Sequence, residues 1–305
     1  MITMKVLKLC WQTFLVSRVP GAFVRSLSFF IPFVFTLDDR QLSFRDSLFY
    51  FFGFFCFLAS IYCLNSFLNF DDDLKNPRFK LQSLYSSRFF MGLFIFFCIF
   101  SGFVFSFLSN TLLFIWACLS LFFWYVYSSS RWRLKLRPII GGLLHWAAQF
   151  FLQLVAWQIW YPLSFNMIVF SSIFSLFSTA GYFRGLVTDY DSDQDVLGRV
   201  RLSLSSVQLL ARSVFLLSYL LLCFWLNYLG MDSILTVFYF MFFLHVTVYV
   251  VFHRIRLVQR KNRFIQLAYL LIFALGFLYL GITEMINLDY MDSGLKKVSV
   301  TIQGD

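Results

Sequence analysis

Long apolar runs separated by short charged breaks make up most of this 305-residue chain. Because a helix needs about 20 apolar residues to cross the roughly 30 Å hydrocarbon core of a bilayer, each run predicts one membrane-spanning helix. Asn110 is nearly the only break between the third and fourth runs, which predicts a tight hairpin there. We place the helices near residues 20–37, 47–70, 89–108, 111–128, 138–157, 162–183, 207–229, 233–252 and 264–286.

The pattern predicts an all-α fold, a polytopic membrane bundle of nine transmembrane helices that forms one domain over residues 1–305. Composition agrees, because 60% of the residues are hydrophobic and only 13% are charged, whereas about 25% are charged in a soluble domain. The polar segment 288–305 is expected to be a mobile tail.

Positive charge is distributed unevenly between the two sides of these helices. The loops on one side hold 19 of the 25 Lys and Arg residues, and the opposite side holds Arg40, Arg45, Lys296 and Lys297. The positive-inside rule then places the N-terminus in the cytoplasm and the C-terminus on the opposite side. We expect a multi-pass protein of the bacterial inner membrane. The net charge of +10 orients the protein in the membrane, so no nucleic acid partner is predicted.

Acidic residues on the predicted cytoplasmic side fall in two clusters only. The first is Asp71–Asp73, directly after the second span. On a helix that continues from Asn65, the residues Asn69, Asp72 and Asp73 share one stripe and Asp71 lies away from it. Such a stripe would descend from the buried end of the span toward the cytosol.

The second cluster follows the sixth span and consists of Asp189, Asp191, Asp193 and Asp195. Asp189 and Asp193 are spaced i, i+4, so they share a helix face. Carboxylates at a helix C-terminus oppose the helix dipole and call for a cation. Mg²⁺ suits this need, because it binds one or two carboxylates together with water and phosphate oxygens. Two facing clusters predict a diphosphate site, and the competing interpretation is a pair of solvated loops.

Basic residues on the same side are candidates for binding phosphate. Arg133 and Lys135 follow the fourth span, and Arg25 lies near the cytoplasmic end of the first span, where it either joins a phosphate site or snorkels. Inside the fifth span, His145 is expected to be a packing residue. Gln149 and Gln153 are expected to contact a neighbouring helix.

These motifs, in this order, resemble the UbiA-type intramembrane prenyltransferases, and the resemblance extends from about Arg18 to Gly198. The first stretch in that family reads N-D-x-x-D-x-x-x-D followed by Pro and basic residues, and its places are taken here by Asn65, Ser66, Asn69, Asp73, Pro77, Arg78 and Lys80. The loop motif Y-S-x-P-x-x-R-x-K-x-x-P is matched by Tyr127, Ser128, Arg133, Lys135 and Pro138. The second stretch, D-Y-E-x-D and then Gly, is matched by Asp189, Tyr190, Asp191, Asp193 and Gly198.

The resemblance implies a bundle around a central lipid-open cavity, with Mg²⁺ as cofactor and a polyprenyl diphosphate and a small or lipid acceptor as partners. The implied catalytic residues are Asp73, Asp189 and Asp193. The metal ligands would be Asp72, Asp73, Asp189 and Asp193, where Asp72 compensates for the two replaced acids. The implied substrate-binding residues are Asn65, Asn69, Arg25, Arg78, Lys80, Tyr127, Arg133 and Lys135.

The leading functional interpretation is Mg²⁺-dependent transfer of a prenyl group from its diphosphate to an unidentified acceptor within the membrane. A related branch of the family transfers phosphoribose to a polyprenyl phosphate, and the run from Arg18 to Asn65 resembles it in part. The two replaced acids also leave open a non-catalytic descendant that binds an isoprenoid. A transporter is disfavoured, because the sequence shows neither an inverted repeat nor paired broken helices.

Overall fold

The computed structural model describes residues 44–75, 86–108, 110–129, 131–132, 134–197 and 202–228, together with Ala22, Ser26 and Phe29. These ranges hold the helices α4 (Phe44–Leu68), α5 (Phe70–Lys75), α6 (Ser87–Ser106), α7 (Thr111–Ser128), the short 3-10 helix η3 (Leu134–Leu136), α8 (Pro138–Trp160), α9 (Phe165–Leu197) and α10 (Leu204–Tyr228). All regular structure within them is helical.

Six of the described helices, namely α4 and α6 to α10, are long and apolar enough to cross a membrane. The chain is therefore an integral, multi-pass membrane protein, as its hydropathy predicts. Each of these six helices coincides with one predicted span. The predicted spans 20–37, 233–252 and 264–286 and the predicted tail lie wholly or largely outside the described residues, so the count of nine stays a prediction.

Residues suited to helix N-termini stand at the starts of α7 and α8. Asn110 is the N-cap of α7, and its side-chain oxygen accepts a hydrogen bond from the Leu112 amide at 3.1 Å. This cap explains how a single polar residue separates two spans, because an asparagine at that position satisfies an amide that the helix leaves free. Pro138 occupies the start of α8, where its missing N–H costs nothing.

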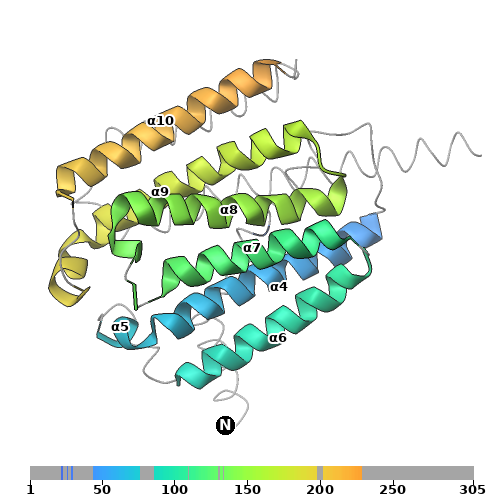
Figure 1. Ribbon diagram of the computed structural model, residues 1–305, viewed down its shortest axis with the longest axis horizontal. Helices are drawn as coiled ribbons and strands as arrows, with labels where there is room; N and C mark the ends of the chain where they lie inside the picture. Colours follow the sequence, from blue (N-terminus) through green and yellow to red (C-terminus); the bar gives the residue numbers. More distant parts are fainter. Residues whose placement is uncertain are drawn as a thin grey trace, which may run out of the picture.

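The helices pack side by side, with α4 and α8 near the middle (Figure 1). Helix α4 contacts α6, α7 and α8; α8 also contacts α7 and α9; and α9 contacts α10. Because successive helices run in opposite directions, the C-terminal ends of α4, α7 and α9 lie at the same end of the bundle as α5, on the left in Figure 1. We call this the α5 end. The described loops predicted to be cytoplasmic, after α4, α7 and α9, begin there.

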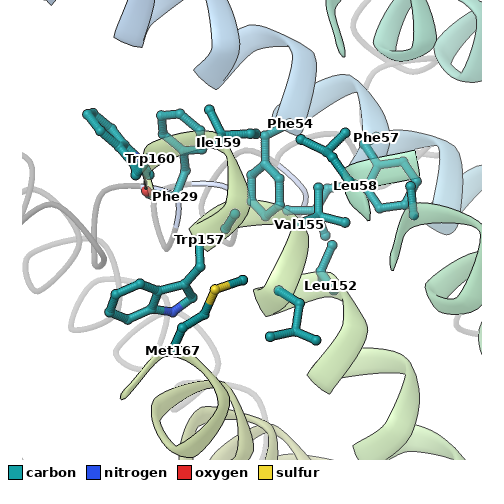
Figure 2. Packing of buried hydrophobic residues seen from close by; sticks show 14 of the residues in the cluster. Phe29, Phe54, Phe57, Leu58, Leu152, Val155, Trp157, Ile159, Trp160 and Met167 are labelled. Atoms are coloured by element: carbon teal, nitrogen blue, oxygen red, sulfur yellow. Dashed lines mark hydrogen bonds between the residues drawn. The ribbon is translucent and has the colours of Figure 1, made fainter. Parts of the chain in front are cut away.

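The apolar core joins α4 to α8 through large buried side chains. Phe54 and Leu58 of α4 lie beside Val155 of α8, and the packing continues to Trp160 and Phe29 (Figure 2). The indole Nε1 of Trp160 donates a 2.7 Å hydrogen bond to the carbonyl oxygen of Phe29, so a polar group at the end of α8 is satisfied inside the core.

The outer face of α6 is apolar and exposed. On α6, the side chains of Phe96, Ile99 and Phe103 are all exposed. A contiguous apolar helix face of this kind is what lipid requires. On its inner side α6 approaches α4 so closely that a Cβ atom added at Gly53 would lie 2.5 Å from Cγ1 of Val104.

Candidate functional site at the α5 end

The helix carrying the first acidic stretch is interrupted at Asn69. Helix α4 ends at Leu68 and α5 begins at Phe70. The Asn69 backbone amide donates to the Asn65 carbonyl at 3.1 Å, and the Asn69 side-chain amide donates to the same carbonyl at 2.8 Å. The Asn65 carbonyl thus accepts both a regular helical bond and a side-chain bond from the residue that separates α4 from α5. The residues of the predicted stripe from Asn65 to Asp73 are therefore divided between α4 and α5, with Asn69 between the two helices.

A hydrogen-bonded network of amides lies at this break. Asn69 is 2% exposed, and its Nδ2 donates to Oδ1 of Asn65 at 3.1 Å. The same Asn65 oxygen accepts a 2.9 Å hydrogen bond from Oγ of Ser128, the last residue of α7. On the other side, Oδ1 of Asn69 accepts a 2.5 Å hydrogen bond from Nζ of Lys135 in η3. The network thus joins α4, α7 and the loop before α8, with a charged donor at its end.

Lys135 is also held through its backbone. Its carbonyl oxygen accepts a 2.8 Å hydrogen bond from the hydroxyl of Tyr182 on α9. The approach depends on Gly141 of α8, because a Cβ atom there would lie 2.3 Å from the Tyr182 hydroxyl oxygen and 2.8 Å from the carbonyl oxygen of Leu134. Lys135 is therefore positioned by α4 at its ammonium group and by α9 at its carbonyl.

Aromatic rings pack next to this loop. The rings of His145 and Tyr182 stack with centroids 5.4 Å apart and an interplanar angle of 18°. Tyr127 presents an edge-on contact to both, at 5.6 Å and 5.7 Å. Trp124 contacts Tyr127 and His145 in the same way. His145 is buried, in agreement with its expected packing role, whereas Tyr127 stays half-buried beside Lys135's loop.

The two acidic stretches lie on helices that contact one another. Helix α5 packs against α9, and Figure 1 shows α5 near the C-terminal end of α9. Helix α9 continues well past its membrane-spanning part, which ends at Val187, so Asp189 and Asp193 are four residues apart on a continuous helix. The hydroxyl of Tyr190 donates a 3.0 Å hydrogen bond to the Leu202 carbonyl, which ties this end of α9 to the start of α10.

The structure brings together part of the predicted site. Asn65, Asn69 and Lys135 form one network, and Tyr127 lies close by. Asp71 is exposed. Other predicted residues lie outside the description: for Asp72, Asp73, Asp189 and Asp193 only the backbone is described, and Arg25, Arg78, Lys80 and Arg133 are not described.

Two residues that matter to the geometry had no role in the sequence analysis. Gly141 and Tyr182 are 41 residues apart and meet only because α8 and α9 pack together. Ser128 was matched to the loop motif, but its bond to Asn65 across α4 and α7 could not be derived from that match.

Gln149 and Gln153, expected at a helix contact, are both buried within the bundle.

Two parts of the site differ in how well they suit Mg²⁺. We call the network around Asn65 and Asn69 the inner part, and the aspartates of α5 and of the C-terminal part of α9 the outer part. Among the described side chains, no three His, Cys, Asp or Glu residues come close enough to hold a metal ion. The amide oxygens of Asn65 and Asn69 already accept hydrogen bonds, so the inner part does not fit a divalent ion. The aspartates of α5 and of the C-terminal part of α9 carry the carboxylate oxygens that Mg²⁺ prefers, and the two helices contact one another. The predicted ligands Asp72, Asp73, Asp189 and Asp193 have side chains outside the described part of the chain.

Comparison with known proteins gives a clear result for structure and none for sequence. No family model and no curated protein matches the chain. A UbiA homolog from Archaeoglobus fulgidus bound to GPP and Mg²⁺ matches with a TM-score of 0.71 and 14% identity, covering 90% of this chain and 99% of the homolog. The apo UbiA homolog from Aeropyrum pernix K1 matches with a TM-score of 0.65 and 15% identity, covering 87% and 98%.

The A. fulgidus homolog bound to DMAPP and Mg²⁺ gives a similar match, with a TM-score of 0.70 at 14% identity over 89% of this chain and 98% of the homolog. Identities this low establish the fold alone. The chain therefore has the fold of the UbiA homologs, diverged far in sequence, as its motifs predicted.

Proposed function

We propose that this protein is a Mg²⁺-dependent prenyltransferase that moves a prenyl group from a polyprenyl diphosphate to an acceptor in the membrane. The observation that carries the proposal is the α5 end of a UbiA-like bundle. There a buried amide network holds the ammonium group of Lys135, and the two helices bearing the acidic stretches contact one another. A homolog with this fold is bound to GPP and Mg²⁺, which supports a prenyl diphosphate as the substrate class.

The carboxylates would hold the metal at the outer part of the site. Asp73, Asp189 and Asp193 are the proposed catalytic residues, and Asp72 joins them as a metal ligand. The Mg²⁺ that these residues would hold would supply positive charge to neutralise the departing diphosphate. Asp189 and Asp193 lie one helical turn apart, so their carboxylates can approach the same ion from one face of α9.

Basic and polar residues would bind the phosphate oxygens. Lys135 is the one whose position the structure describes, held at its carbonyl by Tyr182 and at its ammonium by Asn69. Arg25, Arg78, Lys80 and Arg133 are the further candidates from the sequence. Ammonium and guanidinium groups form charge-assisted hydrogen bonds to phosphate, and these are about twice as strong as neutral ones.

The reaction breaks the bond between the prenyl C1 carbon and the diphosphate oxygen, and the bonding electrons leave with the diphosphate. The acceptor then forms a bond to C1 and releases a proton. The allylic carbon carries positive charge during this step. Aromatic faces stabilise such charge, and Tyr127 lies beside the Lys135 loop where it could do so. Apolar surroundings exclude the water that would otherwise capture the cation.

Turnover of labelled substrate tests the proposal. Purified protein in vesicles is given radiolabelled geranyl diphosphate, Mg²⁺ and a lipid extract of the host membrane. We expect label in an organic-phase product together with free diphosphate, both lost in the Asp189→Ala, Asp193→Ala variant. Asp46→Ala is the control, since Asp46 lies in the first turn of α4, at the far end from α5.

The outcome also separates the other two interpretations. Binding of geranyl diphosphate without any product or diphosphate release would contradict an enzyme and favour an isoprenoid-binding protein. Incorporation of label from phosphoribosyl diphosphate into a polyprenyl phosphate, with none from geranyl diphosphate, would favour phosphoribosyl transfer.

A further inference from the structure

Two glutamine side chains are buried in the membrane-spanning helix α8 without a hydrogen-bond partner. Gln149 is 5% exposed and Gln153 is 8% exposed, and neither amide bonds to another group in the part of the chain that the structure describes. Each amide carries two N–H donors and one carbonyl acceptor. Burial of such groups is costly when nothing replaces the hydrogen bonds that water would give. Two unpartnered amides one helical turn apart therefore indicate a polar partner from outside the chain.

The glutamines continue a face of α8 that meets both neighbouring helices. His145 lies four residues before Gln149, and its ring centroid is 5.3 Å from that of Trp124 on α7 and 5.4 Å from that of Tyr182 on α9. Residues spaced i, i+4 lie on the same side of a helix. The two amides therefore follow the side of α8 that lies between α7 and α9, inside the bundle.

A third polar group without a partner lies on α7 beside this face. The indole Nε1 of Trp124 is buried and has no acceptor among the described residues, although its ring packs edge-on against His145. On α9, the hydroxyls of Ser175 and Thr179 donate to carbonyl oxygens of their own helix at 2.6 Å and 2.8 Å. Their protons are therefore not available to the glutamines, and hydrogen-bonding capacity is left for a ligand.

These groups lie just below the amide network of the α5 end. Trp124 is four residues before Ser128, the residue of α7 that bonds to Asn65. At about 1.5 Å per residue, Trp124 lies about 6 Å further into the membrane. A molecule bound to Trp124 and the glutamines would therefore lie beneath the proposed diphosphate site, on the side where an apolar prenyl chain would enter the bundle.

The charge of the surrounding helices limits the chemistry of such a molecule. Neither α7 nor α8 contains a Lys, Arg, Asp or Glu residue between its first and last positions. A carboxylate or an amine bound between these helices would be buried without a counter-charge from them, which costs far more than burial of a neutral polar group. Amides and an indole N–H suit a hydroxyl group, because a hydroxyl both donates and accepts hydrogen bonds.

We propose that Gln149, Gln153 and Trp124 bind the polar group of the prenyl acceptor, and that this acceptor is a neutral alcohol or phenol with an apolar body. Its hydroxyl donates to a glutamine carbonyl oxygen and accepts from the Trp124 indole or a glutamine N–H. The inference rests on the proposed function, which requires an acceptor, and adds the chemical class of that acceptor and its place in the bundle.

Equilibrium dialysis of the detergent-solubilised protein with two radiolabelled probes tests the proposal. The probes, 2-naphthol and 2-naphthoate, share a ring system but carry a hydroxyl and a carboxylate. We expect saturable binding of 2-naphthol at neutral pH, and binding of 2-naphthoate weaker by about tenfold or more, since an unpaired buried charge is costly. The Gln149→Leu, Gln153→Leu variant should bind 2-naphthol about tenfold more weakly, because it lacks both amides.

Gln158→Leu is the matched control. Gln158 is a buried glutamine of the same helix, 8% exposed, and at 100° per residue it lies about 180° around α8 from Gln149. Its replacement should leave the affinity for 2-naphthol unchanged. Trp124→Phe keeps a ring against His145 and removes only the N–H donor, so it should weaken 2-naphthol binding by roughly threefold to tenfold.

The unfolding temperature separates a binding role from a structural one. Leucine has no polar group to satisfy, so the Gln149→Leu, Gln153→Leu variant should unfold at the same temperature as the unaltered protein or at a higher one. An unchanged 2-naphthol affinity in this variant, or tighter binding of 2-naphthoate than of 2-naphthol, would overturn the inference. A lower unfolding temperature together with unchanged affinity would assign the glutamines to helix packing instead.

Failure of this inference can be told apart from failure of the proposed function. If the glutamine variant transfers label from geranyl diphosphate as fast as the unaltered protein, the acceptor site is wrong and the prenyltransferase stands. If the unaltered protein neither binds nor turns over geranyl diphosphate, the proposed function fails, and the role of the hydroxyl as prenyl acceptor fails with it.

Discussion

Replacement of Gly141 by alanine should weaken the hydrogen bond that holds the backbone of Lys135. Gly141 is not itself one of the proposed substrate-binding residues. The added Cβ would lie 2.3 Å from the Tyr182 hydroxyl oxygen and 2.8 Å from the carbonyl oxygen of Leu134. The first contact pushes Tyr182 away from the Lys135 carbonyl that it binds at 2.8 Å. The second contact is with backbone, which cannot rotate aside as a side chain can. We therefore expect both lower stability and weaker diphosphate binding.

The expected size follows from three effects. Overpacking of a close contact costs about 1–3 kcal/mol, and the lost Tyr182 hydrogen bond costs about 0.5–1.5 kcal/mol. Alanine recovers up to about 1 kcal/mol, because it favours the helix more than glycine does. The net loss in the free energy of unfolding is about 0.5–3.5 kcal/mol when the full helix gain applies. Gly181→Ala is the matched control, because a Cβ atom there meets nothing within 4 Å and only the helix gain remains.

Thermal unfolding in detergent, followed by size-exclusion chromatography of heated samples, measures the difference between the two variants. The Gly141→Ala protein should unfold at a lower temperature than the Gly181→Ala protein. Adding Tyr182→Phe to Gly141→Ala removes the atom in the closest contact, so the double variant should recover part of the loss and the effects should not add. Equal unfolding temperatures for the Gly141→Ala and Gly181→Ala variants would refute the packing of α8 against α9 described above.

Three further outcomes are expected. Gly53→Ala should lower the unfolding temperature, because its Cβ would lie 2.5 Å from Cγ1 of Val104, and Val104→Ala in the same chain should restore part of it. Ser128→Ala removes a 2.9 Å hydrogen bond to α4 and should cost about 1 kcal/mol of stability and weaken pyrophosphate binding in calorimetry. Trp160→Phe loses its 2.7 Å bond to the Phe29 carbonyl and should lower the unfolding temperature in the same assay; an unchanged value would contradict that bond.

Hydropathy predicted the described helices well because lipid imposes it directly. A span must be apolar over its whole length, so the runs 111–128 and 138–157 could be placed to within a few residues of α7 and α8. Hydropathy did not predict that α9 extends to Leu197, because the apolar pattern stops where the helix leaves the membrane. Twelve residues without glycine or proline follow Gly185, and they allow the helix to continue into water with its aspartates.

The site was predictable only in part because its contacts are of two kinds. Asn65, Asn69 and Lys135 belong to spaced motifs, so their types and order could be recognised in the sequence. At Asn69, between α4 and α5, a side-chain amide bonds to a backbone carbonyl, and a regular helical projection does not include such a bond. The contact between Gly141 and Tyr182 depends on how closely two helices pack, which no local pattern encodes.

The amide at residue 69 also changes how the empty site is stabilised. A carboxylate at a position that is 2% exposed would be costly to bury without a permanent counter-charge, so a site built on acids depends on its metal for stability. Asn69 is neutral, and its oxygen accepts a hydrogen bond from the Lys135 ammonium. Burial of residue 69 therefore needs no metal ion in this chain, which predicts that chelation of divalent metal leaves the unfolding temperature of the protein unchanged.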